Sequence, residues 1–269
     1  MATTLTSTQD FVPESEWPSV SVMLDGFGKQ TLASSPKLAG TTLAVADEHG
    51  NSVDYTFHDE ASLSWSQGDA HKHPNGSAGY KAIEARTGIF IIDFVRGAGH
   101  ACENVTIILD QNTGAVTTGI SRLIEVAGEV RGTTDFSYAN VSGQQTTHAR
   151  TDELVGKRIF YRYSDIETYE HIYLNLGTFT WHCLRGGEVG LADTDHCKAW
   201  KVAEDLYIFF WTEKVMTIEA VLLVDLEQER SIGRMFGWDG TLCTELILPF
   251  NSRLSVLNTT VYPGDVSKA

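Results

Sequence analysis

The 269-residue chain contains no long hydrophobic run, and none of its apolar stretches approaches the roughly 20 residues that cross a bilayer as a helix. Residues 1–18 also lack the basic and apolar regions of a signal peptide. We therefore expect a cytoplasmic protein. Its four cysteines, Cys102, Cys183, Cys197 and Cys243, are then expected to be free thiols.

Positive charge is scarce as well. The 20 Lys and Arg residues are outnumbered by 35 Asp and Glu residues, which gives a formal net charge of −15. An acidic surface without a basic cluster repels phosphate backbones and anionic membranes, so we expect neither nucleic acid nor membrane as a partner. A small molecule is the expected partner. The composition does not decide between a monomer and a homodimer.

The common catalytic signatures are missing too. The sequence has no P-loop, no G-x-G-x-x-G, no G-x-S-x-G and no convincing Ser/His/Asp order, so we expect no bound cofactor. Residues 190–197 do crowd Asp193, Asp195, His196 and Cys197 together, and these side chains suit zinc. Without a supporting C-x-x-C or H-E-x-x-H spacing, a loop whose side chains serve turns is the favoured reading, and we expect no metal.

What the chain does contain is an internal repeat. Residues 38–43 (LAGTTL) resemble residues 154–159 (LVGKRI), and in each copy a tryptophan, Trp65 or Trp181, follows the glycine after 25 residues. Residues 88–94 then match 205–211, and residues 107–110 match 222–225, in the same order. We infer two copies of one unit, at about 36–122 and 152–238.

Each copy is predicted to be all-β. Its short runs are rich in β-branched and aromatic residues and are separated by turn signals. In the second copy we predict strands at 157–163, 168–174, 177–184, 198–203, 205–213, 218–226 and 230–236. Such closely spaced strands predict an up-and-down antiparallel sheet that closes into a barrel.

The repeat divides the chain into an N-terminal barrel unit, 1–150, and a C-terminal barrel unit, 151–269. The polar, Gly/Thr-rich stretch 128–150 is predicted to be the linker between the two units. Residues 11–17 and 244–250 lie outside the repeat, and we expect their apolar side chains to cover the barrel mouths or the seam between the units.

Alternation along the strands of the second copy sorts aromatic side chains with polar tips onto one face. A ligand-binding barrel would have such a face, although ordinary core packing of Tyr and Trp also explains it. His171 and His182 are evenly balanced between structural and pocket roles, because a buried imidazole needs partners for its nitrogens. The candidates on this face are Tyr161, Tyr163, Tyr169, His171, Tyr173, Tyr207, Phe209, Trp211, Glu213, Arg234, Phe236 and Trp238.

The first copy keeps the tryptophan but not the histidines. It has Tyr55 at the position of His171 and Ser66 at the position of His182. This contrast predicts that the second copy carries the chemistry and that the first is its structural partner.

Five segments of the second copy, 158–165, 169–175, 180–184, 190–195 and 206–211, closely resemble the molybdenum cofactor biosynthesis protein F family. The likeness covers about 154–240, and the first copy matches the N-terminal half of that family more loosely. The resemblance implies a calycin-like, lipocalin-related fold of two β-barrel units. It also implies importance for His171, Trp181, His182, Asp193 and Asp195.

The expected function is that of a cofactor-independent enzyme that transfers a proton on a small, largely apolar or aromatic oxygenated molecule: a lyase, isomerase, decarboxylase or cyclase. His171 is the expected acid or base, and Tyr161, Tyr169 or Tyr207 would stabilise an oxyanion. His182, Glu213 and Arg234 are further candidate participants. The alternatives are a calycin-type carrier or an accessory protein of molybdopterin biosynthesis.

Overall fold

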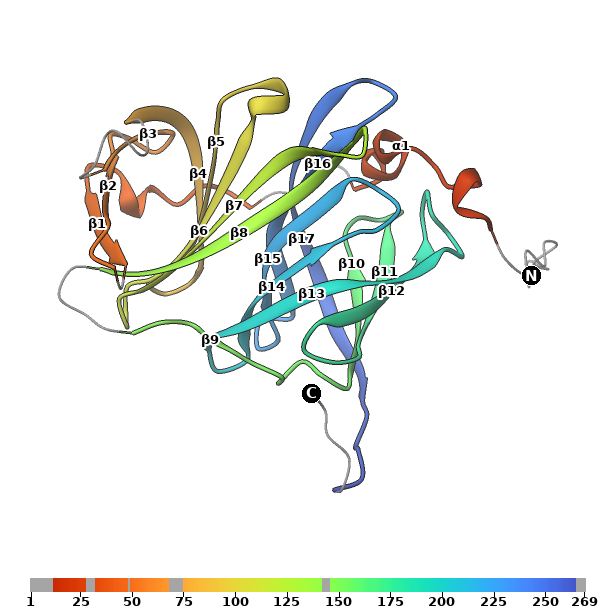
Figure 1. Cartoon of the computed structure of the whole chain (residues 1–269). Coiled ribbons are helices and arrows are strands. Elements are labelled where there is room, and N and C mark those ends of the chain that lie inside the picture. The colour runs from red at the N-terminus through yellow and green to blue at the C-terminus, as the bar shows by residue number, and fades with distance from the viewer. Residues whose placement is uncertain (1–11, 28–31, 48, 68–74, 142–145, 265–269) are drawn as a thin grey trace.

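The chain folds into two antiparallel β-barrels that lie side by side (Figure 1). The computed structural model describes residues 12–27, 32–47, 49–67, 75–141 and 146–264. The all-β fold with two related barrel units is confirmed, and each barrel is an eight-stranded up-and-down meander.

The strands of the N-terminal barrel follow one another around it in chain order, and β8 pairs with β1 to close it. They are β1 (Thr42–Asp47), β2 (Ser52–Phe57), β3 (Ser62–Gln67), β4 (Gly76–Arg86), β5 (Ile89–Arg96), β6 (Glu103–Asp110), β7 (Ala115–Val126) and β8 (Glu129–Val141).

The C-terminal barrel repeats this order, and β17 pairs with β10 while β12 pairs with β13. Its strands are β10 (Lys157–Arg162), β11 (Thr168–Tyr173), β12 (Thr178–Arg185), β13 (Ala192–Ala203), β14 (Leu206–Thr212), β15 (Ile218–Asp225), β16 (Arg230–Asp239) and β17 (Thr244–Thr259). The short β9 (Ala149–Arg150) adds to the outside of β13.

Helical segments are few in the described chain. They are the helix α1 (Val20–Asp25) and the 3-10 turns η1 (Glu14–Glu16), η2 (Pro36–Leu38) and η3 (Gly99–Ala101). In this part of the chain no helix has the length and apolar character needed to span a membrane.

The eighth strand of each barrel corrects two predictions. Residues 129–141, predicted to be linker, form β8, and residues 244–250, expected to cover a mouth or the seam, lie in β17. Neither alternates cleanly: β8 is mostly half-buried, and β17 contains Pro249. Pro249 faces Arg234 of β16, and β10 pairs with β17 only from Arg253 onward. The edge of β17 toward β10 is therefore unpaired at Pro249, so a residue without a backbone N–H is tolerated there.

The pairing of two neighbouring strands in each barrel shows how the two copies of the repeat align. Tyr55 pairs with Trp65 across β2 and β3, and His171 pairs with Trp181 across β11 and β12. Tyr55 and His171 therefore hold equivalent places in the two barrels.

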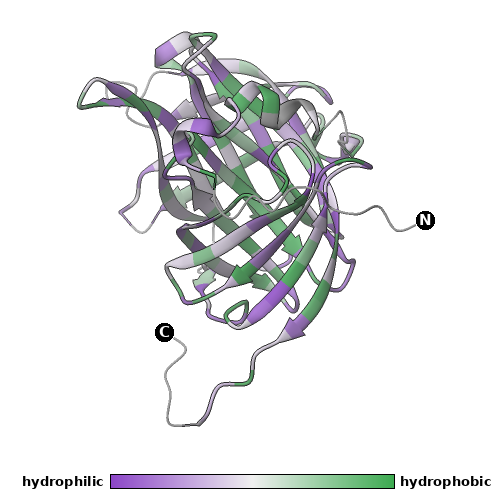
Figure 2. Ribbon diagram, turned by 90° about the vertical axis from the view of Figure 1, so that its right-hand side faces the viewer, coloured by the Kyte–Doolittle hydropathy of each residue, from purple (hydrophilic) through white to green (hydrophobic). Residues whose placement is uncertain are grey.

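The longest apolar runs belong to strands that are buried on both faces. Along β14 and β15 nearly every side chain is buried, because one face fills the barrel and the other packs on the neighbouring barrel. Apolar and polar residues instead alternate along strands that face solvent (Figure 2). The interface core joins Ile83, Ala85, Ile89, Ile91 and Ile108 of the first barrel to Trp200, Leu206, Ile208, Phe210, Val221, Leu223 and Ile232 of the second.

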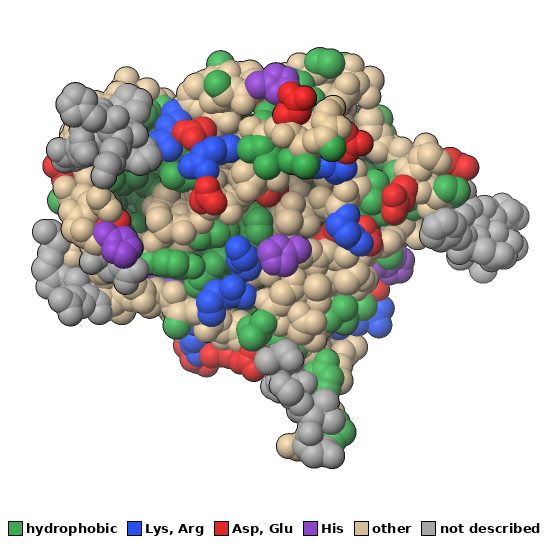
Figure 3. Space-filling model, viewed as in Figure 1, with side chains coloured by type: hydrophobic (Ala, Val, Ile, Leu, Met, Phe, Trp, Pro, Cys, Tyr) green, Lys and Arg blue, Asp and Glu red, His purple; other side chains and the backbone are tan. Residues whose placement is uncertain are grey.

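Polar groups are also buried where the barrels meet. The Arg86 guanidinium pairs with the Asp225 carboxylate at 2.6 Å, and the Trp200 indole N–H donates to the Tyr138 hydroxyl at 2.9 Å. The Thr134 hydroxyl donates to the Glu219 carboxyl at 2.6 Å. These contacts fix the orientation of one barrel on the other. On the face shown in Figure 3, acidic and basic side chains are interspersed over both barrels.

The Glu219 carboxyl gives the interface a pH dependence. Glu219 is 2% exposed, and burial raises its pKa to about 7, above its usual value of 4.5. A raised folded-state pKa gives stability that is complete below the unfolded pKa and is lost as pH rises through 7. We expect Glu219→Gln to gain roughly 3 kcal/mol of unfolding free energy relative to wild type between about pH 5 and pH 8. Denaturant titrations across that range measure it, and parallel curves for the two proteins would contradict it.

Candidate functional site

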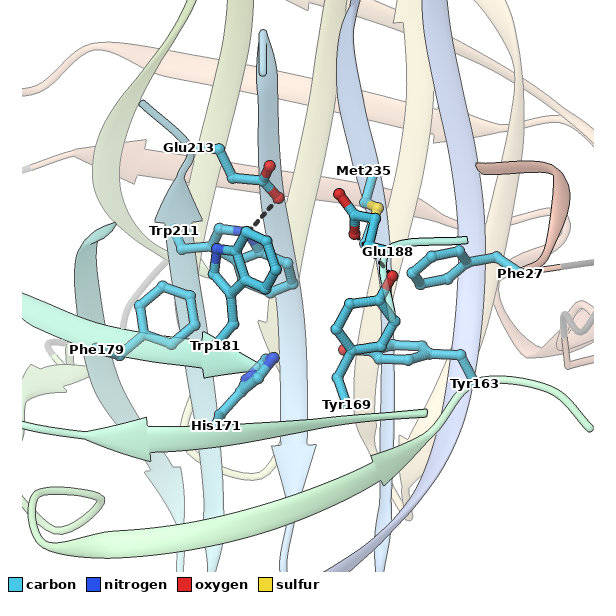
Figure 4. Close-up of a pocket in the computed structure, with 10 residues that line it drawn as sticks. All are labelled: Phe27, Tyr163, Tyr169, His171, Phe179, Trp181, Glu188, Trp211, Glu213 and Met235. Atoms are coloured by element: carbon cyan, nitrogen blue, oxygen red, sulfur yellow. Dashed lines mark hydrogen bonds between the residues drawn. The ribbon is translucent and has the colours of Figure 1, made fainter. Parts of the chain in front are cut away.

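A small cavity lies inside one mouth of the C-terminal barrel (Figure 4). It is bounded by β10, β11, β12, β14 and β16, the loop after β12, and the chain just after α1. The space open to the centre of a water molecule is about 20 Å³, which is room for about one water. The lining residues are Phe27, Tyr163, Tyr169, His171, Phe179, Trp181, Glu188, Trp211, Glu213 and Met235.

His171 lies in the middle of β11 and points into this cavity. Its ring packs against aromatic rings, with centroids 4.4 Å from Tyr161 and 5.1 Å from Phe179. Burial lowers the pKa of His171 to about 3, so the imidazole is neutral at physiological pH. Its Nδ1 has no hydrogen-bond partner among the described residues. His171 Nδ1 can therefore accept or donate one hydrogen bond, and the neutral ring brings no positive charge into the cavity.

Glu188 is the carboxyl that the sequence did not single out. It lies in the turn between β12 and β13, is 4% exposed, and accepts a hydrogen bond at 2.8 Å from the Tyr169 hydroxyl. Burial raises the pKa of Glu188 to about 7, and the charge of Glu167 adds to this rise while the Tyr169 bond opposes it. Residues 185–188 (RGGE) lie between the strands predicted at 177–184 and 198–203, and no local pattern reveals that barrel closure buries the last of them.

Glu213 follows β14 and faces the cavity near Glu188 (Figure 4). Burial raises the pKa of this carboxyl well above its usual value, and the charges of Glu188 and Asp195 raise it further. The indole N–H of Trp211 lies 3.4 Å from its Oε1. Glu188 and Glu213 are thus two protonatable carboxyls at the same end of one cavity.

Asp195 positions a wall of the cavity without lining it. It is 1% exposed, and its Oδ2 accepts a hydrogen bond at 2.8 Å from the Trp181 indole N–H. Its Oδ1 accepts the backbone N–H of Lys214 at 3.1 Å. Asp193 lies at the rim and pairs with the Lys214 ammonium at 2.7 Å. Of the two aspartates, Asp195 therefore acts on the cavity through Trp181.

Residues that precede the first barrel cover the mouth of the second. The Phe27 ring packs 4.8 Å from the Tyr163 ring, and the Trp17 ring lies 5.7 Å from the Trp181 ring. The Ser164 hydroxyl donates to the Gly26 carbonyl at 2.7 Å. We expected residues 11–17 to cover a mouth: Trp17 does, whereas Phe11 lies outside the described residues. Phe27 was not predicted.

His182 does not face the cavity, and its placement in the pocket was wrong. On β12 the residues Phe179, Trp181 and Cys183 are buried inside the barrel, so His182 points outward. Its Nδ1 lies 2.9 Å from the Glu170 carboxylate, which also binds the Arg158 guanidinium.

Arg234, Phe236 and Trp238 were placed on the wrong face. They point from β16 toward the other barrel, where Arg234 bonds the Thr106 and Ser121 hydroxyls at 3.0 and 2.6 Å. Phe236 and Trp238 pack with residues of the first barrel in a separate cluster. Met235, between them, lines the cavity. Because both faces of β16 are buried, its alternation could not indicate which face looks inward.

Four other predicted residues lie inside the barrel but away from the cavity. The Tyr161 and Tyr173 hydroxyls bond to each other at 2.7 Å, and Phe209 packs beside Tyr173 with centroids 5.0 Å apart. The Tyr207 hydroxyl donates to the Glu153 carboxylate at 2.8 Å, in the segment that leads into β10. Tyr161 and Tyr207 are therefore not placed to stabilise an oxyanion in the cavity, and Tyr169 lines the cavity but donates its hydroxyl proton to Glu188.

The loop predicted at 190–197 is mostly strand, because β13 begins at Ala192. Strand alternation sends Asp195 and Cys197 inward and leaves His196 exposed outside. In the part of the chain that the structure describes, no three His, Cys, Asp or Glu side chains form a metal-binding group.

The N-terminal barrel also has a hollow, of about 720 Å³, which Trp65, Arg96, Glu103 and Arg122 line in part. Its charged groups are paired: Glu103 bridges Arg96 and Arg122, and Arg122 also pairs with Asp135. No buried polar atom without a hydrogen-bond partner lies on this lining among the described residues. The C-terminal cavity is therefore the stronger candidate site.

The outward position of His182 makes a prediction. We expect His182→Ala to change the affinity and turnover of a cavity ligand less than about twofold, since Glu170 keeps its Arg158 partner. Titration calorimetry with the variant and wild type measures the affinity. A tenfold loss would return His182 to the list of cavity residues.

Two family models match the chain: the MoaF N-terminal domain at residues 15–125 and the MoaF C-terminal domain at residues 148–260. Protein MoaF of Klebsiella aerogenes is 33% identical over 270 aligned residues, which cover 92% of this chain and 97% of that protein. A crystal structure from Burkholderia vietnamiensis, provisionally described as a β-lactamase, is 20% identical with a TM-score of 0.34 and covers 40% of this chain and 100% of its own. That structural likeness is too weak to inform function. The two domain matches and the full-length relative show that the chain belongs to the MoaF family.

Proposed function

We propose that the C-terminal barrel is the active site of a cofactor-independent enzyme that transfers a proton on a small, largely apolar or aromatic oxygenated molecule. The reaction would be of lyase, isomerase, decarboxylase or cyclase type. The observation that carries the proposal is the Glu188 carboxyl at the cavity wall. One of its oxygens is bonded to Tyr169, and the other is buried without a partner among the described residues.

Glu188 suits both directions of proton transfer. Its pKa of about 7 leaves it partly ionised at neutral pH, where a proton acceptor or donor works most efficiently. The pKa of Glu213 is raised well above its usual value, which favours the protonated form, and that form can donate a hydrogen bond. The two carboxyls therefore fit the roles of base and acid.

The Tyr163 hydroxyl supports this assignment. Tyr163 lines the cavity, is 2% exposed, and its hydroxyl has no hydrogen-bond partner among the described residues. Burial raises its pKa well above 10, so the hydroxyl keeps its proton and can donate to an oxyanion that forms on the substrate. The neutral His171 imidazole can orient the same oxygen.

A carrier is the competing function. Carriers hold ligands with apolar walls, and burying a carboxyl without a cationic partner costs several kcal/mol or leaves it protonated. Two such carboxyls in one cavity are a cost that a carrier of a neutral molecule does not require. This difference favours catalysis.

A substrate must displace the cover of the cavity. About 20 Å³ holds no organic molecule, and Phe27 packs over Tyr163 and Tyr169. We therefore expect the segment around Gly26 and Phe27 to move outward when a ligand binds.

The test is proton exchange. The protein is incubated in D₂O with a panel of small aromatic and apolar alcohols, ketones and amines, and each compound is followed by mass spectrometry and NMR. We expect protein-dependent deuterium incorporation or conversion of at least one compound that binds in the cavity. Tight cavity binding by panel members without exchange or conversion would overturn the enzyme and support the carrier.

A further inference from the structure

The cavity has an unbalanced set of charges. Glu188 and Glu213 lie at one end of it, and Glu167 and Asp195 act on them from nearby. None of the ten lining residues is Lys or Arg. The ammonium of Lys214, next in sequence to Glu213, is mostly exposed and pairs with Asp193 at the rim. Among the described residues, none therefore supplies a cation to the carboxyls inside the cavity.

Besides His171 Nδ1, two further buried polar atoms of the lining residues have no hydrogen-bond partner among the described residues. They are the Oε1 atom of Glu188 and the hydroxyl oxygen of Tyr163, in side chains that are 4% and 2% exposed. An unpaired buried polar atom costs about 1–3 kcal/mol. Glu188 Oε1 accepts hydrogen bonds when ionised, so the missing partner is an N–H or O–H donor.

Aromatic rings complete the surroundings. The indoles of Trp181 and Trp211 and the ring of Tyr169 stand around the space below the two carboxyls (Figure 4). Ring faces attract cations, most strongly in sites from which water is excluded. Trp181 is 4% exposed and Trp211 is 3% exposed, so this condition holds.

We propose that the molecule bound in this cavity carries a protonated amine, held between Glu188 and Glu213 against the indoles, on a small apolar or aromatic body. The proposal rests on the proposed function in one respect, that the same cavity takes the substrate. Binding of the amine does not itself require turnover.

The proposal has an electrostatic consequence. Burial raises the pKa values of Glu188 and Glu213 in the empty cavity, and neighbouring carboxylates add to the rise, Glu167 for Glu188 and both Glu188 and Asp195 for Glu213. An ammonium between the carboxyls favours their ionised forms and so lowers both pKa values. Amine binding near neutral pH therefore releases up to about one proton, which a neutral ligand of the same shape does not.

The experiment compares benzylamine, benzyl alcohol and benzoate, three probes with one body and different charges. Calorimetric titrations of the full chain at about pH 6.5, in phosphate and in MES, give affinity and proton release. We expect benzylamine to bind at least about tenfold more tightly than benzyl alcohol, with benzoate weakest, and only benzylamine to release protons. Equal affinities for amine and alcohol, or no binding of the amine, would overturn the proposal.

Variants show which side chains cause the preference for the amine and the proton release. Glu213→Gln and Glu188→Gln should each remove most of the preference for the amine and the proton release, while benzyl alcohol affinity stays within about twofold. Glu219→Gln, which alters a buried carboxyl outside the cavity, is the matched control and should keep the preference. A preference that survives both cavity variants would also overturn the proposal. Turnover of a neutral substrate only would overturn the amine proposal and leave the proposed enzyme function. Amine binding without turnover would leave the amine proposal and overturn the enzyme function.

Discussion

Glu188→Gln is expected to lower turnover of the substrate by about 10²–10⁴-fold, the usual contribution of a positioned acid or base. The amide keeps the shape of the side chain and an oxygen that accepts the Tyr169 hydroxyl, so the cavity should keep its form. It cannot take up a proton at neutral pH. Once a substrate is found by deuterium exchange, kcat for the variant and wild type measures the effect.

A matched variant separates this effect from folding. Glu170 lies next to His171 on β11, faces outward, and binds Arg158 and His182. Glu170→Gln makes the same chemical change on the opposite face of the strand and should lower kcat less than about threefold. Equal turnover by Glu188→Gln and wild type would remove Glu188 from the mechanism.

Arg234→Met is expected to destabilise the protein by roughly 3 kcal/mol without acting on the cavity. Arg234 is 1% exposed, and its Nε lies 3.6 Å from the Asp93 carboxylate at the junction of the barrels. Removing the guanidinium leaves the partly buried Asp93 carboxyl with its Asn104 and Thr106 hydrogen bonds and without its nearest buried cation. Urea denaturation measures the loss of unfolding free energy.

A second substitution tests the cause. Asp93→Asn combined with Arg234→Met removes both charges and should recover most of the lost stability, because an uncompensated charge and not a cavity is the source of the cost. If Arg234→Met instead weakens ligand binding tenfold and leaves stability unchanged, Arg234 belongs to the ligand site after all.

The sequence predicted most of the fold because the two copies support each other. Matched spacing from glycine to tryptophan and alternating strands identified a duplicated barrel, and seven of the eight strands of the second copy were predicted at least in part. The eighth strands were missed for a shared reason. Each closes its barrel by pairing at both edges, so long-range hydrogen bonds and not a strong local pattern determine its structure.

The candidate site was predicted less completely. His171, Trp181 and Trp211 face the cavity as predicted, and Trp181 is the clearest case, because its strand alternates between buried and half-buried side chains. Arg234 shows the limit, because a strand buried on both faces has no polar side to orient it. Glu188 shows a second limit of prediction from the sequence. It follows two glycines in a turn, and only the tertiary closure of the barrel buries its side chain.

The cover formed by Trp17 and Phe27 also sets an order of events during synthesis. These residues leave the ribosome before any strand of either barrel, yet Tyr163, Tyr169 and Trp181, on which they pack, are made only after more than half of the chain. The first barrel can pair all its strands before the segment with Trp17 and Phe27 packs on the second barrel. The earliest described part of the chain is thus among the last to reach its place. A C-terminal domain excised at residue 148 would leave the ribosome with its aromatic mouth uncovered.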